Sequence, residues 1–167
     1  MHRLLSAAAL TIVLATAGCT SEPVEPAPFQ AVDVVKIDEG TIGGAGWTLV
    51  TFHNERGDVC LQLRDAQMQV GSDLSGGCGP WDDSPTGGRY LDGKGPGSSE
   101  FAYGLLTEPA AGVTATAPGH DPVTVPAKPM PAGTGAAKFF VIAFPTPAGT
   151  WTYTARDGAG APVQLGP

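Results

Sequence analysis

From residue 31 onward, the chain consists of short apolar or alternating runs, each bounded by turn residues. Residues 59–64 show the pattern most clearly, because three apolar side chains alternate there with Cys, Gln and Arg. Such a period of two is typical of half-buried strands. The runs that we predict to be strands are Ala31–Ile37, Trp47–His53, Val59–Arg64, Glu100–Leu106, Gly112–Ala117, Val123–Pro126, Lys138–Phe144, Thr150–Arg156 and Pro162–Leu165.

Two further features of the pattern indicate the fold class. Residues 138–144 are apolar on both faces, which predicts a central, covered strand. Residues 54–58, 119–122 and 157–160 have the Asn, Asp and Gly chemistry of tight turns, and no segment after the first eighteen residues sustains a helical period. The chain is therefore predicted to be all-β, as a two-sheet antiparallel β-sandwich that is loosely immunoglobulin-like, with a small barrel as the alternative.

Residues 71–99 interrupt this pattern, since they are Gly-rich, polar and without alternation. We expect a long loop there, and a loop of this length in a small domain is commonly functional. Exposed aromatic and Arg side chains are typical contact anchors. The residues that we assign to a possible binding surface in this loop are Trp81, Asp82, Asp83, Arg89 and Tyr90. The alternative is that Trp81 folds back as a small satellite core.

The N-terminus has the pattern of an export signal. A basic start precedes an apolar run, residues 4–17, which as a helix would reach about 21 Å and fall short of a bilayer core. Thr16-Ala17-Gly18-Cys19 resembles a bacterial lipobox, which implies a signal peptide over residues 1–18 and a lipid on Cys19. The Ala-Thr-Ala sequence at 15–17 leaves a second route open, in which ordinary cleavage releases a soluble protein.

The cysteine count favours lipidation, because an exported chain with an odd number of cysteines carries a spare thiol. The chain has three cysteines, and lipidation of Cys19 would leave Cys60 and Cys78 as a pair. Export favours their oxidation, and a bridge between them would stabilise the fold by about 3 kcal/mol. A redox-active pair is the other interpretation, although the close C-x-x-C spacing is missing.

The rest of the composition indicates one tethered domain. Residues 19–30 are Pro-rich and predict an extended tether, and residues 31–167 are enough for a single β domain. Without residues 1–18, the chain has 8 basic and 16 acidic side chains, a formal charge of −8. This balance argues against a nucleic-acid partner and against electrostatic adhesion to an anionic bilayer, so the membrane contact would depend on the lipid.

The sequence contains no recognisable catalytic motif, and we assign no catalytic residue. His53, His120 and Met130 are too widely spaced for a copper site. The acids of residues 73–92 lack the spacing of a calcium loop and are interpreted as solvated side chains. We therefore predict no metal and no cofactor.

The order of several segments resembles a family of small secreted proteins and lipoproteins of actinobacteria. The segments that carry the resemblance are Trp47–Val50, Val59–Leu63, Gly76–Gly79, Phe139–Val141 and Ala155–Gly160. The resemblance covers residue 47 to the C-terminus and implies export, a β fold and the cysteine pair. The family has no assigned activity, so no functional residue is carried over.

These observations favour a non-enzymatic β domain that binds an envelope protein or a wall component. As a lipoprotein it would lie on the outer face of the cytoplasmic membrane, and as a secreted protein it would be soluble. The first alternative is an accessory or sensor subunit of an envelope transporter or enzyme. The second is a hydrolase or metal-dependent enzyme that uses the 71–99 loop.

Overall fold

The computed structural model describes residues 31–65, 74–79, 87–134, 137–147 and 149–167. In these ranges the regular elements are all β-strands, without a helix, and they form three antiparallel sheets of four strands each. The predicted signal peptide, Cys19, the tether and Trp81, Asp82 and Asp83 lie outside the described residues. None of the described ranges contains a helix that is long and apolar enough to span a membrane.

The three sheets follow the chain in blocks. Sheet A has the order β1 (Val32–Ile42), β2 (Ala45–His53), β3 (Val59–Asp65) and β4 (Ser75–Gly79). Sheet B has the order β5 (Gly88–Lys94), β6 (Glu100–Leu106), β10 (Lys138–Phe144) and β9 (Lys128–Pro129). Sheet C has the order β12 (Pro162–Val163), β11 (Thr152–Asp157), β7 (Ala110–Thr116) and β8 (Val123–Pro126).

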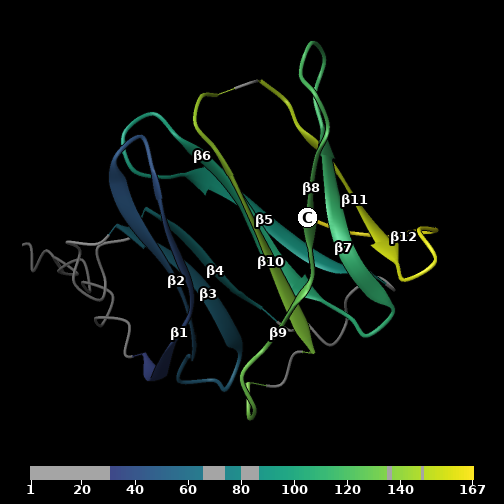
Figure 1. Cartoon of the computed structure of the whole chain (residues 1–167). Helices are drawn as coiled ribbons and strands as arrows, with labels where there is room; N and C mark the ends of the chain where they lie inside the picture. The colour runs from purple at the N-terminus through teal and green to yellow at the C-terminus, as the bar shows by residue number, and fades with distance from the viewer. Residues whose placement is uncertain (1–30, 66–73, 80–86, 135–136, 148) are drawn as a thin grey trace, which may run out of the picture.

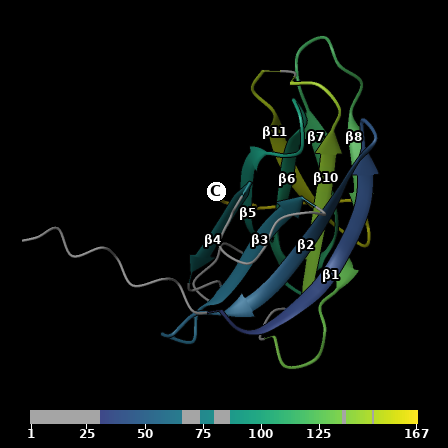
Figure 2. The same cartoon turned by 90° about the vertical axis from the view of Figure 1, so that its left-hand side faces the viewer.

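Sheet B lies between the other two and is buried on both faces (Figure 1). Alternate residues of β6 and β10 point to opposite faces, so the two strands contribute to two cores. On one face, Phe101 and Tyr103 pack with Leu61 of sheet A; Figure 2 shows sheet A in front of sheet B. On the other face, Phe140 and Ile142 pack with sheet C.

Sheets B and C are joined at both edges and form a closed ring of strands. At one edge the chain passes directly from β8 in sheet C to β9 in sheet B, with only Ala127 between them. At the other edge, the Gly166 N–H donates to the Gly88 carbonyl (3.0 Å) and the Tyr90 N–H donates to the Gly166 carbonyl (2.9 Å). The core between sheets B and C is therefore enclosed by strands on all sides but opens at its ends.

Many of the predicted strands are confirmed. Residues 100–106, 123–126 and 138–144 are strands with the predicted bounds, and the other six predicted strands differ only at their ends. The last of the three is β10, which occupies the predicted central position. The two-sheet, immunoglobulin-like arrangement is not confirmed, because the described residues form three sheets.

The expectation of one long loop over residues 71–99 is wrong, because β4 and β5 both lie in this range. Their glycines concealed the alternation, and the structure shows why they are there. A Cβ on Gly93 would lie 2.4 Å from the Cβ of Ser75, and one on Gly77 would lie 3.0 Å from a methyl of Leu91. Sheets A and B approach so closely at β4 and β5 that a side chain at Gly93 would overlap Ser75, and one at Gly77 would require Leu91 to move.

Two predicted hairpin turns are closed by side-chain oxygens. Asn54 Oδ1 accepts hydrogen bonds from the backbone N–H groups of Arg56 and Asp58, both at 2.9 Å. Asp157 Oδ1 accepts from those of Ala159 and Ala161 in the same way. These are the local bonds that make Asn and Asp frequent in turns, and they place β2 against β3 and β11 against β12.

Strand β1 is the outer strand of sheet A, and its pairing with β2 is irregular. The register shifts twice, between Val32 and Val35 and between Lys36 and Asp38. Asp33, within the first irregularity, has a positive φ of 55°. The exposed side chains along this strand include Lys36 and Glu39, which form an ion pair of 2.9 Å.

Candidate functional site

A cleft opens at one end of the ring, where the tip of the β5–β6 hairpin faces the start of β11. Its volume is about 380 Å³, within the range of small-ligand sites. We call it the β5–β11 cleft. The residues that line it are Asp92, Gly93, Lys94, Glu100, Phe101, Gly149, Thr150, Trp151 and Tyr153.

Three charged side chains reach the cleft from sheet B. Lys94 and Glu100 are direct partners in the β5–β6 register, and Asp92 lies two residues before Lys94 on the same face. Within the described residues none of the three has a hydrogen bond or an ion pair. The cleft thus has two carboxylates and one ammonium group that are available to a ligand.

Two aromatic residues form the opposite wall of the cleft: Trp151, which directly precedes β11, and Tyr153 in β11. The Trp151 ring stacks on Phe144, with ring centroids 4.1 Å apart and an interplanar angle of 19°. The centroid of the His120 ring lies 5.6 Å from that of Trp151. The Trp151 Nε1–H is buried and has no hydrogen-bond partner in the described structure. Because buried donors are almost always paired, this group is an exception in need of an explanation.

Tyr153 connects the cleft to the core between sheets B and C. Its ring lies 4.7 Å from that of Tyr90 on β5. Burial raises the pKa of the Tyr153 phenol well above its ordinary value, and the negative charge of Asp92, the neighbouring Tyr90 and the charge of Glu100 raise it further. The phenol therefore stays protonated at neutral pH and can donate a hydrogen bond.

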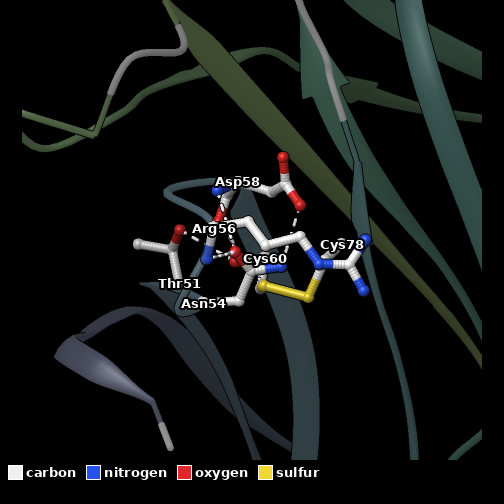
Figure 3. The surroundings of a disulfide bond; sticks show 6 residues. All are labelled: Thr51, Asn54, Arg56, Asp58, Cys60 and Cys78. Carbon is white, nitrogen blue, oxygen red and sulfur yellow. Dashed lines mark hydrogen bonds between the residues drawn. A yellow bond between two sulfur atoms is a disulfide. The ribbon is translucent and has the colours of Figure 1, made fainter.

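The disulfide between Cys60 and Cys78 is present, and it joins two neighbouring strands (Figure 3). The two cysteines are directly opposite each other in the β3–β4 register, with Cα atoms 4.0 Å apart. We had expected Cys78 to lie in a loop, but it is part of the edge strand β4. Cys60 is fully buried beside Val50 and Phe52, whereas Cys78 is exposed.

The structure places the predicted binding residues Arg89 and Tyr90 next to each other on β5, where their side chains point to opposite faces of sheet B. Tyr90 packs against the core between sheets B and C, on Tyr153. Both residues line a smaller hollow of about 90 Å³ together with Cys78. The remaining three residues of that predicted surface, Trp81, Asp82 and Asp83, lie outside the described residues.

The sequence analysis did not assign the residues of the β5–β11 cleft to a site. Asp92 was interpreted as a solvated loop acid, and Trp151 as an ordinary strand residue. One feature of the sequence could have indicated this site. Asp92, Lys94 and Glu100 lie on either side of a Gly-rich turn and are separated by even numbers of residues. If the turn closes a hairpin, this spacing places all three side chains on one face of the sheet.

The comparisons with known proteins leave the site to be interpreted from its geometry. No protein-family model, curated protein or solved structure matches the chain. In the described ranges no three His, Cys, Asp or Glu side chains lie close enough together to hold a metal ion.

Proposed function

We propose that this chain is an exported, lipid-anchored and non-enzymatic domain that binds a component of the cell envelope in the β5–β11 cleft. The observation that carries the proposal is the cleft itself. It places Asp92, Lys94 and Glu100, without partners of their own in the described structure, opposite the ring of Trp151. A concave site with a few convergent polar groups beside aromatic rings has the general form of a small-ligand site.

Two further features support the location outside the cytoplasm. The lipobox-like sequence that ends at Cys19 supports anchoring, and the Cys60–Cys78 disulfide is compatible with an oxidising compartment. Cys19 precedes a Pro-rich tether of about ten residues, which would hold the domain roughly 30 Å from its anchor.

Membrane fractionation of Cys19→Ala tests the anchor. We expect wild type in the membrane fraction and the variant in the soluble exported fraction, with mass spectrometry showing an acylated N-terminal Cys19 in the wild type. Cys78→Ala is the matched control, because it removes a cysteine without touching the anchor. The anchoring proposal is wrong if the Cys19 variant stays with the membrane.

In-cell photocrosslinking tests the binding role of the cleft. A photoreactive residue at Thr150, which is exposed in the cleft lining, should capture an envelope component. The same residue at Glu108, beyond the far end of β6, is the control and should not capture it. Capture of one recurrent membrane protein would identify an accessory subunit, whereas capture of wall material would identify a wall-binding domain. Equal capture at both positions would contradict a binding role for the cleft.

A further inference from the structure

The size of the β5–β11 cleft limits its ligand to a small group. A volume of about 380 Å³ accommodates one or two sugar-sized rings. The cleft is built from the ends of two hairpin strands and from β11, so its polar groups are carried by regular elements. A site on strands holds its ligand groups in a more fixed geometry than one on loops.

The polar lining requires a ligand that both donates and accepts hydrogen bonds. Carboxylates accept only, and an ammonium group donates only. Asp92 and Glu100 therefore need donors, while Lys94 needs an acceptor. Hydroxyl groups supply both functions from one atom, and a ring with several hydroxyls can satisfy all three side chains at once.

The aromatic wall provides a complementary surface for the apolar face of such a ring. Trp151 lines the cleft and is held against Phe144, so it is fixed before a ligand arrives. Aromatic rings combine a large contact area with a polar group at the edge. Acyl chains and other purely apolar groups do not fit, since they would bury the charged groups of the opposite wall without partners.

The charge of the site disfavours anionic ligands. The two carboxylates exceed the single ammonium group in the cleft, and residues 19–167 carry a formal charge of −8. Phosphate- or uronate-bearing polymers would approach a surface of their own sign.

From these observations, and resting on the binding function proposed above, we propose that the β5–β11 cleft binds an uncharged, hydroxyl-rich saccharide. Asp92 and Glu100 accept hydrogen bonds from its hydroxyls, Lys94 donates one, and Trp151 packs against its ring.

The proposal is tested by NMR titration with four defined oligosaccharides, using the indole N–H signal of Trp151 as the readout. The probes are cellotetraose and chitotetraose, which are uncharged, a fully deacetylated chitosan tetramer, which is cationic, and tetragalacturonate, which is anionic. We expect at least one uncharged probe to shift the Trp151 signal and leave that of Trp47, in the core between sheets A and B, unchanged.

Asp92→Asn and Glu100→Gln should each weaken this binding about tenfold, because a hydrogen bond to a carboxylate is replaced by a weaker one to a neutral amide. Glu108→Gln is the matched control and should bind like wild type, since Glu108 lies beyond the opposite end of β6. Both cleft variants keep the shape of the side chain, so we expect them to fold.

Three outcomes would overturn the saccharide assignment: tighter binding of tetragalacturonate or of the chitosan tetramer than of both uncharged probes, no shift with any probe, or equal weakening by Glu108→Gln. Release of new reducing ends from a probe would show hydrolysis and overturn a purely binding role. If crosslinking at Thr150 captures a protein while all probes fail, the saccharide assignment is wrong and the cleft remains a binding site.

Discussion

Sheet B presents a closed face to sheet A and a partly open face to sheet C. Toward sheet A, Phe101 and Tyr103 are buried along the whole contact, and Phe101 meets the edge of Trp47 with ring centroids 5.3 Å apart. Toward sheet C, the core is apolar near Phe140 but ends in the charged groups of the β5–β11 cleft. Neighbouring residues of the same two strands thus serve stability on one face and are available for binding on the other.

The position of the cleft depends on where the core between sheets B and C ends. At the cleft end, β5 and β6 carry Asp92, Lys94 and Glu100 on the face toward sheet C and Phe101 on the face toward sheet A. A change at one of the charged positions should alter binding with little effect on folding. A change at Phe101, which reaches the cleft lining but is buried in the core between sheets A and B, should act mainly on folding.

The largest expected effect is that of Phe101→Ala. The variant removes a fully buried ring from the core between sheets A and B, and such truncations cost about 3–5 kcal/mol. Asp92→Asn, on the other face of sheet B, should change the free energy of unfolding by less than about 0.5 kcal/mol. Urea denaturation of both variants measures the difference, and similar losses would show that the two faces are not distinct.

Removal of the disulfide should be the next largest effect. Cys60→Ala and Cys78→Ala each open a bridge that spans eighteen positions, and each should lower the free energy of unfolding by about 3 kcal/mol. Cys60→Ala should lose somewhat more, because only Cys60 is part of a buried cluster. Under reducing conditions Cys78→Ala and wild type should unfold alike; a persistent gap would mean that the effect does not come from the bridge.

The hydrogen bond that joins sheets A and B should contribute less. Tyr103, which is buried in sheet B, donates from its hydroxyl to Ser75 Oγ on β4 at 3.0 Å. A double-mutant cycle with Tyr103→Phe and Ser75→Ala should give a coupling energy of about 1 kcal/mol. A coupling energy near zero would show that this bond does not hold the two sheets together.

The smallest expected effect is the contribution of Tyr153 to the pH dependence of stability, and it is measurable only at alkaline pH. Its pKa is raised in the folded protein above the ordinary value of 10.0, so the unfolded chain loses this proton first as the pH rises above 10. The contribution of the neutral phenol to stability is fully present below pH 10 and is lost as the pH rises toward the folded pKa. Melting temperatures measured from pH 8 to 11 should fall more steeply for wild type than for Tyr153→Phe. Parallel curves would contradict the raised pKa.

The local parts of the fold could be predicted from the sequence because they depend on local chemistry. The alternation in residues 59–64 was enough to predict β3, and the apolar run 138–144 was enough to predict β10. Two turns could be predicted from Asn54 and Asp157. Strand β4 was missed because Gly76 and Gly77 carry no side chain that could alternate.

The number of sheets and the cleft could not be predicted, because both depend on contacts between distant parts of the chain. At one edge of the ring the Gly166 N–H donates to the Gly88 carbonyl and the Tyr90 N–H donates to the Gly166 carbonyl. The two glycines have no side chain whose pattern could indicate this contact. Asp92 and Trp151 come together only after that closure. Of the predicted surface residues, Arg89 and Tyr90 lie on the strand that carries Asp92 and Lys94, and Tyr90 shares their face of sheet B.

The irregular outer strand of sheet A has a consequence for how copies of this protein meet one another. An open strand edge can pair with the same edge of a second molecule and start a growing sheet. Strand β1 interrupts its own hydrogen-bond register twice and exposes Lys36 and Glu39 along that edge. Charges and bulges of this kind prevent such pairing. We therefore expect β1 to resist edge-to-edge pairing between copies of this protein, even at high concentration.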